Sequence, residues 1–344
     1  MINKLELINF KSFLNASLEI KPLTVLGGLN SSGKSTVIQA INMILSYYKN
    51  QKQSVALPDH VSPRLQKSKS SKDNYFMISM QSDSFGVIDL RVNIDVESYT
   101  FTGSIQEAKI PNFQYISADR LGPQNILELN PEYKTVEIGT KGEYIIDYID
   151  KNRNMNINEK LIRDSKEDPR LLENINAWLQ YISPGILLDY EIKRDRNASY
   201  PNYNNIYPTE TGFGLSYTLP MIAALLVPVQ ENDSILLIEN PEGHLHPKGQ
   251  AAMGELIALT VSTGKQVILE THSDHIINSI RVSVRESKIN INKEDVILFF
   301  CNRERNDSGH YTTAIPIEID ENGTLSGYPD NFLDEWSNQL SRLI

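Results

Sequence analysis

Residues 28–36 read Gly-Leu-Asn-Ser-Ser-Gly-Lys-Ser-Thr, and they constrain the fold more than any other part of the chain. The two glycines let the backbone turn with positive φ and approach an anion closely. Amides of such a loop, with the first amides of a following helix, point at phosphate oxygens. The spacing matches the phosphate-binding loop G-x-x-x-x-G-K-[ST] at every fixed position. The candidate nucleotide-contacting residues here are Gly28, Asn30, Ser31, Ser32, Gly33, Lys34, Ser35 and Thr36.

The flanks of the loop carry the patterns that the motif requires. Residues 23–26 form an apolar run of strand length, and apolar residues recur at helical spacing between Val37 and Tyr48. Lys34 is expected to neutralise the β- and γ-phosphates, and Ser35 to offer a hydroxyl to Mg²⁺. The pattern predicts strand, loop and helix around a nucleoside triphosphate and its metal.

Two later apolar strands end in polar residues. Residues 234–239 end in Glu239, and residues 266–270 are followed closely by His272. Strands alternating with helices indicate a parallel sheet, which binds ligands at the carboxyl ends of its strands. Glu239 is therefore expected to hold Mg²⁺ opposite the loop.

The remaining pattern predicts an α/β protein of two lobes: an antiparallel β lobe and a parallel-sheet core with flanking helices. Alternating residues predict strands near the N-terminus and an antiparallel meander over 75–102. We expect one head over 1–344. Within it we expect a basic exposed loop at 49–72, a helical and polar insertion at 124–205, and a second lobe at 206–344.

Composition narrows the partners and the compartment. The net charge is −10, so binding of nucleic acid would need a local basic patch. The 49–72 loop has six basic residues against one acid, which fits either a solvated loop or a DNA contact. The single cysteine, Cys301, lies in an apolar run and fits a buried residue in a reducing cytoplasm. The N-terminus does not read as a signal peptide, and the apolar stretch near 221–229 is too short to span a bilayer. We therefore expect a soluble, cytoplasmic protein that does not bind membranes.

Together these stretches resemble the ABC-type ATPase heads of the SMC, RecF and OLD group. The likeness is greatest to short stand-alone bacterial AAA-family ATPases with a C-terminal domain of unknown function. It rests on the phosphate-binding loop and on residues 10–13, 115–123, 211–220, 238–247, 270–275 and 320–343.

This resemblance implies ATP and Mg²⁺ as cofactors and a homodimer that forms when ATP is bound. The signature segment of such heads would lie within 211–216, where Gly212, Gly214 and Ser216 are the candidates although no Leu-Ser-Gly-Gly occurs. It also implies that His272 senses the γ-phosphate and that the loop at 244–246 contacts the twin subunit.

One position departs from the pattern of these heads. A glutamate usually follows the Mg²⁺-binding acid and serves as general base, but here that residue is Asn240. An amide cannot accept a proton from water at neutral pH. Either Glu242 takes the role or hydrolysis is slow and ATP acts mainly as a dimerising ligand.

We therefore predict a homodimeric ATPase that acts as an ATP-controlled switch or DNA sensor. The resemblance further implies antiphage defence beside a separate nuclease or toxic effector. The alternatives are a RecF-like DNA-repair ATPase that binds DNA through the 49–72 loop, and a scaffold for a partner enzyme. A different chemistry, a zinc site, would use Glu242 with four histidines. These are His244, His246, His272 and His275.

Overall fold

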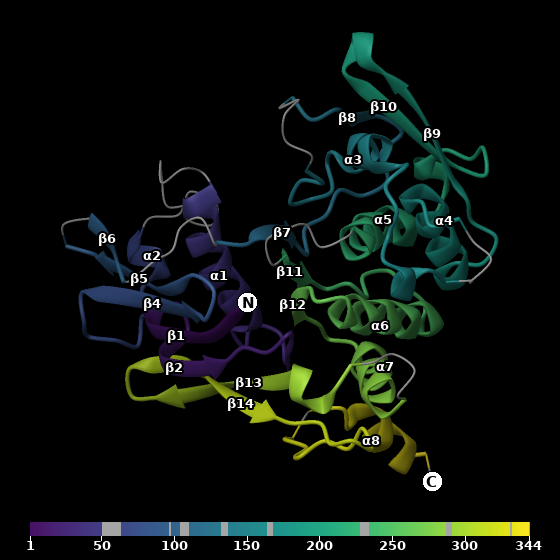
Figure 1. The fold of residues 1–344 in the computed structure, drawn as a ribbon. Coiled ribbons are helices and arrows are strands. Elements are labelled where there is room, and N and C mark those ends of the chain that lie inside the picture. Colours follow the sequence, from purple (N-terminus) through teal and green to yellow (C-terminus); the bar gives the residue numbers. More distant parts are fainter. Residues whose placement is uncertain are drawn as a thin grey trace. The chain divides into compact units, whose positions relative to one another are not determined.

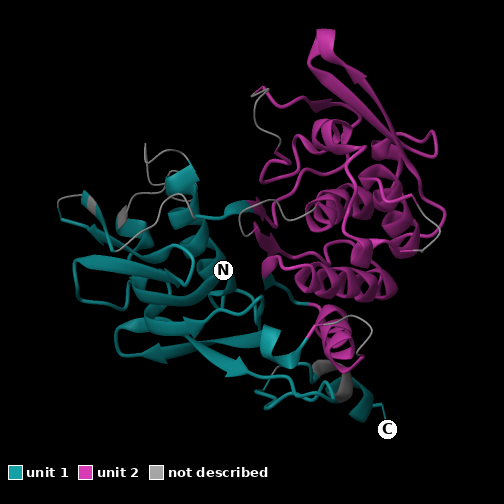
Figure 2. Ribbon diagram, in the orientation of Figure 1, with its two compact units in different colours: residues 1–113, 268–272, 292–344 teal, residues 114–267, 273–291 magenta. Residues whose placement is uncertain are grey.

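The structure is a computed structural model that describes residues 1–49, 63–95, 98–103, 110–131, 137–163, 168–227, 234–286, 291–330 and 332–343. Figure 1 labels its helices and strands. The chain divides into two compact units, which Figure 2 colours separately. Unit 1 comprises residues 1–113, 268–272 and 292–344, and unit 2 comprises residues 114–267 and 273–291.

Unit 1 contains a five-stranded antiparallel sheet with the strand order β2-β1-β4-β5-β6 (Figure 1). Its strands are β1 (Ile2–Phe10), β2 (Phe13–Glu19), β4 (Tyr75–Ser82), β5 (Gly86–Asn93) and β6 (Ser98–Thr102). Every second residue faces the core because side chains alternate along a strand, and Leu5 and Leu7 are fully buried in this way. The predicted antiparallel β lobe is confirmed.

A second sheet of unit 1 carries the glycine-rich loop. Strand β3 (Leu23–Gly28) pairs in parallel with β13 (Val296–Asn306), which pairs antiparallel with β14 (Gly309–Ile317). The next neighbour of β3 is β12 (Gln266–Glu270), whose last three residues belong to unit 1. Helix α1 (Lys34–Lys49) follows the loop and buries an apolar stripe that includes Val37, Ile38 and Ile41. The predicted strand, loop and helix are all present.

Shorter elements complete unit 1. They are α2 (Pro63–Gln66), the 3-10 turn η6 (Lys293–Asp295) and α8 (Glu335–Ser341). Residues 50–62 of the predicted basic loop lie outside the described residues. Residues 63–72 differ from the expected exposed loop, because the Ser68 amide donates to the Asn9 carbonyl over 2.7 Å and both Gln66 and Ser68 are buried. Pairing with the end of β1 orders this stretch.

Unit 2 is mainly helical. Its helices are α3 (Ile145–Asn152), α4 (Leu171–Ile182), α5 (Phe213–Leu226), α6 (Pro247–Ser262) and α7 (Asp274–Arg285), with 3-10 turns η3 (Glu159–Leu161), η4 (Arg194–Arg196) and η5 (Pro208–Glu210). Strand β11 (Ser234–Glu239) lies in this unit beside β7 (Asn112–Ile116), most of which belongs to the unit as well. Trp178 and Leu179 of α4 are fully buried in its core. No helix among the described residues is long and apolar enough to cross a membrane.

The region predicted as a helical and polar insertion, 124–205, also holds a small antiparallel sheet. Its strand order is β8-β10-β9, with β8 (Leu127–Glu128), β9 (Leu188–Lys193) and β10 (Ala198–Tyr203). Strand β10 includes Pro201, which argues against a central strand. The proline is tolerated because β8 pairs only with Ala198 and Ser199, so β10 is an edge at Pro201.

The unit boundaries also differ from the expected second lobe at 206–344. Residues 292–344 and the short stretch 268–272 group with the N-terminal strands instead. The reason is the parallel pairing of β13 with β3, which joins the C-terminal part of the chain to the strand before the glycine-rich loop.

Candidate functional site

The glycine-rich loop of unit 1 has the backbone that its sequence predicts. Positive φ angles occur at Gly28 (130°), Ser31 (59°) and Gly33 (101°), and α1 begins directly afterwards at Lys34. The glycine angles lie outside what residues with a Cβ adopt readily. The amide of Thr36 donates to the Gly33 carbonyl over 3.1 Å, so the loop passes straight into the first helical turn. A loop of this shape forms an anion-binding concavity at a helix N-terminus.

Lys34 lies inside this loop and is only 3% exposed. Its Nζ donates to the carbonyls of Gly28 over 3.0 Å and of Leu29 over 2.8 Å. The same Nζ lies 3.9 Å from Oε1 of Glu270, whose side chain is 8% exposed. A buried ammonium is costly unless it is paired and hydrogen-bonded, and here the loop itself supplies its partners. The loop thus holds a buried positive charge at the N-terminus of α1.

His272 follows the end of β12 in the same unit. The Thr271 amide donates to the Leu26 carbonyl over 3.1 Å, which fixes this segment beside β3. Burial, with a smaller contribution from the positive charge of Lys34, lowers the pKa of His272. The imidazole is therefore neutral at pH 7, where it can both donate and accept a hydrogen bond. The structure brings His272 together with the loop, as the sequence predicts, and adds Glu270 as the carboxylate facing Lys34.

In unit 2, Glu239 ends strand β11 and is 5% exposed. Its Oε2 accepts from the amide of Ala118 over 3.2 Å. Burying a carboxylate requires partners of this kind, and a backbone amide fixes its direction. The predicted apolar strand that ends in Glu239 is present, and a backbone hydrogen bond orients its carboxylate.

Arg120 is a central residue of unit 2 whose role the sequence pattern does not reveal. It is 3% exposed and donates to three carbonyls: Ser117 over 2.9 Å, Glu239 over 2.7 Å and Asn240 over 2.6 Å. Burial lowers its pKa to about 10, against opposing effects of Tyr217, Glu242 and Glu239, so it stays charged at neutral pH.

The turn after β11 has a specific backbone. Asn240 has a φ of 46° and His244 a φ of 61°, and the Gly243 amide donates to the Asn240 carbonyl over 3.1 Å. Asparagine tolerates the left-handed region better than most residues, which explains the residue type at 240 in this chain. The Asn240 Oδ1 is buried without a hydrogen-bond partner among the described residues. Glu242 lies in the turn, half-exposed and close enough to raise the pKa of Arg120.

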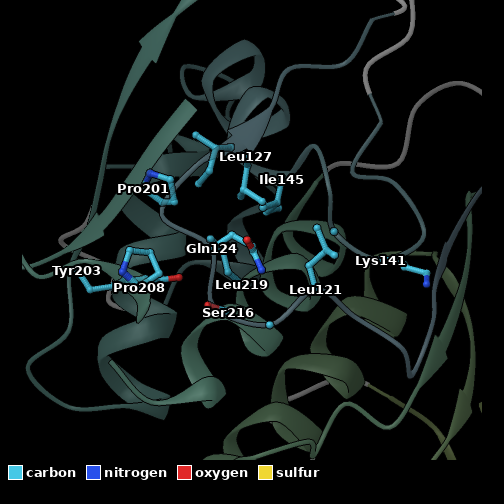
Figure 3. A pocket seen from close by; sticks show the side chains of 13 residues that line it. Leu121, Gln124, Leu127, Lys141, Ile145, Pro201, Tyr203, Pro208, Ser216 and Leu219 are labelled. Carbon is cyan, nitrogen blue, oxygen red and sulfur yellow. The ribbon is translucent and has the colours of Figure 1, made fainter. Parts of the chain in front are cut away.

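The predicted signature segment forms the start of α5. Gly212 is the N-cap, is exposed and has open space around it. A Cβ on Gly214 would lie 2.8 Å from the His244 carbonyl oxygen, so this glycine permits close approach of helix and turn. Ser216 hydrogen-bonds to Tyr203 and lines a cavity of about 20 Å³ inside unit 2 (Figure 3). This volume holds about one water molecule. The Ser216 hydroxyl is thus engaged within its own unit.

The zinc alternative is not supported by the histidine positions. The His244 ring packs between Phe213 and Tyr217, with ring centroids at 5.4 and 4.8 Å. The Nδ1 of His246 accepts from the amide of Lys248 over 3.3 Å and so caps α6. In the part of the chain that the structure describes, no three histidine, cysteine or acidic side chains gather as metal ligands.

The structure thus forms two groups of candidate residues. Unit 1 brings the loop, Lys34, Glu270 and His272 together, and unit 2 brings Glu239 and Glu242 near the start of α5. Glu270 and Arg120 are the additions. Their signals in the sequence were a glutamate at the end of the strand over 266–270 and an arginine within residues 115–123.

Comparison with known families identifies the chain. A model described as the AAA ATPase domain matches residues 1–86 and 66–277. The chain belongs to the AAA ATPase domain family. Residues 291–343 of this AAA family member match a second model, a protein of unknown function (DUF3696). No curated protein matches the chain.

Solved structures confirm the fold of this AAA family member. The Smc head bound to the C-winged helix domain of ScpA superimposes with a TM-score of 0.54 at 16% identity, covering 91% of this chain and 97% of that one. An Smc head domain with an extended coiled coil, bound to the C-terminal domain of ScpA derived from Pyrococcus furiosus, gives 0.51 at 12% identity and covers 99% of both chains. The predicted resemblance to SMC-type ATPase heads is therefore confirmed at the level of fold.

Proposed function

We propose that this chain is a P-loop ATPase that binds ATP with Mg²⁺, dimerises in the ATP-bound state and hydrolyses the nucleotide. The observation that carries the proposal is the loop of unit 1, where left-handed glycines and a buried Lys34 ammonium form a preorganised anion site. Family membership supports the choice of ATP as ligand.

The residues that would hold the cofactors fit the chemistry. Residues 28–36 would bind the phosphates through backbone amides and Lys34. Ser35 and Glu239 would hold Mg²⁺, which when bound supplies neutralisation of phosphate charge. A hydroxyl and a carboxylate are the oxygen ligands that Mg²⁺ takes in proteins. His272, held neutral beside Lys34, would face the γ-phosphate.

Glu242 is our candidate for the residue that orients and deprotonates water. It is the carboxylate in the turn after Glu239, whereas Asn240 cannot take up a proton. The exposed Gly212 at the start of α5 is our candidate contact to the nucleotide of a second copy, with Gly214 allowing the close packing behind it. The Ser216 hydroxyl plays no part in this proposal, because Tyr203 engages it.

Mass measurement by light scattering, with and without ATP and Mg²⁺, tests the proposal. We expect the unmodified chain to double its mass with ATP, and Lys34→Ala to abolish both nucleotide binding and this change. Lys4→Ala is the matched control, because Lys4 is half-exposed and pairs with Glu6 on the same unit. Unchanged ATP binding by Lys34→Ala would refute the assignment of the loop.

Hydrolysis is tested separately with Glu242→Gln. We expect this variant to bind ATP and dimerise normally while the rate of hydrolysis falls by about 10²–10⁴, the usual contribution of general base catalysis. An unchanged rate would remove Glu242 from this role.

We further propose that the ATP-bound dimer acts as a switch or DNA sensor in the cytoplasm and controls a separate nuclease or toxic effector in antiphage defence. The resemblance of the sequence to the OLD group supports this part. Co-purification with Glu242→Gln, which holds the ATP-bound state, is the test, and the absence of any bound effector would count against it.

DNA binding would run through the exposed Lys69 and Lys72, since Lys67 is turned back onto the carbonyls of Ser68 and Ser71. Paired Lys→Glu changes at 69 and 72 should weaken DNA binding and reduce its salt dependence. Unchanged binding would remove the DNA role of this segment.

A further inference from the structure

The C-terminal residues that match a family of unknown function lie against the glycine-rich loop of unit 1. Strand β13 pairs in parallel with β3, placing Phe300 opposite Gly27 and Cys301 opposite Gly28. Strand β14 returns along the other side of β13. The segment therefore supplies the strand adjacent to the one that carries the loop.

The glycines of the loop are in near contact with this segment. A Cβ on Gly28 would lie 2.3 Å from the carbonyl oxygen of Cys301. A Cβ on Gly33 would lie 2.6 Å from the Oγ1 of Thr312. Real Cβ atoms do not approach other atoms this closely, so the C-terminal segment leaves space only for glycine at both positions of the motif.

Thr312 makes a direct hydrogen bond to the loop. Its Oγ1 donates to the carbonyl of Ser32 over 2.8 Å, and its amide donates to the Ser12 carbonyl over 2.8 Å. Thr312 is 3% exposed and Ser32 is 1% exposed, so the Ser32 carbonyl has no access to solvent. A buried carbonyl requires a partner, and Thr312 provides it.

We propose that the C-terminal segment is a working part of the nucleotide site and that Thr312 is its positioning residue. By holding the Ser32 carbonyl, Thr312 fixes the peptide planes of the loop, and with them the amides that would face phosphate. Electrostatic binding of phosphate depends on such preorganised donors. This inference rests on the proposed function, because it assumes that the loop binds ATP.

The neighbouring residue offers a matched control. Thr313 lies on the same strand with its side chain on the opposite face, and its Oγ1 donates to Oε1 of Glu304 over 2.8 Å. Replacing either threonine by valine removes one hydroxyl and keeps the shape of the side chain. Only the change at 312 affects the loop.

Two measurements on the full chain test the inference. The first is amide hydrogen exchange of residues 29–33 without nucleotide, and the second is ATP affinity by calorimetry. For Thr312→Val we expect about fivefold faster exchange and about fivefold weaker ATP binding, the loss of one buried hydrogen bond. Thr312→Ser, which keeps the hydroxyl, should restore both values, and Thr313→Val should leave both unchanged. Thr312→Ala carries the same expectation as valine and replaces it if the valine variant does not fold.

Unchanged exchange in both Thr312→Val and Thr312→Ala, or equal changes in Thr313→Val, would overturn the inference while ATP binding by the unmodified chain remains. Failure of the proposed function is a different result, since the unmodified chain would then bind no ATP.

Discussion

Arg120 offers the sharpest test of how the turn after β11 is held. Arg120→Met keeps the apolar stem and removes the guanidinium that donates to Ser117, Glu239 and Asn240. The guanidinium also lies 5.1 Å from the centroid of the Tyr217 ring, so it ties the start of α5 to the same turn. The variant leaves three carbonyls without their charged donor.

The magnitude follows from two opposing terms. Hydrogen bonds from a charged donor contribute roughly 1.5–3 kcal/mol each. Against them stands the cost of burying the charge, about 3 kcal/mol from the depressed pKa. The free energy of unfolding of unit 2 should therefore fall by about 3 kcal/mol, a decrease in Tm of about 10 °C for a unit of this size.

Fluorescence of Trp178, buried in unit 2, is the assay, with the other tryptophan changed by Trp336→Phe in every variant. Arg163→Met is the matched control. Its guanidinium also lies over an aromatic ring, Tyr181 at 3.7 Å, but its side chain is 32% exposed and its ion pair with Glu255 is at 3.2 Å. That variant should lose less than about 1 kcal/mol. Equal losses in the two variants would refute the reasoning.

Two further changes have definite expected results. Gly33→Ala should abolish ATP binding, measured by calorimetry, because the new Cβ would collide with the side chain of Thr312. The control is Gly264→Ala, at a similar φ of 97° but in open space, which should cost only about 1–2 kcal/mol of backbone strain. ATP binding by Gly33→Ala would contradict the close contact. Burial lowers the pKa of Lys265 to about 7, so the unfolded chain binds more protons between pH 7 and 10.5 and stability must rise with pH there, by about 2 kcal/mol from pH 7 to 9. Urea unfolding at pH 7 and pH 9 should show that Lys265→Met loses this rise in stability. Lys160→Met should keep it, because Lys160 is an exposed lysine that also donates to a carbonyl. An equal rise in both variants would exclude Lys265 as its source.

The sequence predicted those parts of the site whose structure depends on a short run of consecutive residues. The loop follows from glycine conformation and fixed spacing, and the strands over 234–239 and 266–270 follow from apolar runs that stop at polar residues. Each of these depends on fewer than ten consecutive residues.

The parts that sequence missed depend on residues far apart. Arg120 binds carbonyls about 120 positions away, and Thr312 binds one 280 positions away. The spacing of apolar residues does not predict a hydrogen bond from a side chain to a backbone carbonyl far away in the sequence. Strand β10 was missed for another reason: Pro201 reads as a loop residue unless the end of the short neighbouring strand β8 is known.

The pairing of β13 with β3 has a consequence for how the protein is made. On a ribosome, residues 28–34 emerge long before residues 296–301, and at 5–20 residues per second the delay is on the order of tens of seconds. Unit 2 ends at residue 291, so all of it can assemble during that wait. The loop acquires its neighbouring strand only near the end of synthesis, so an unfinished chain lacks the strand that pairs with β3 beside the loop.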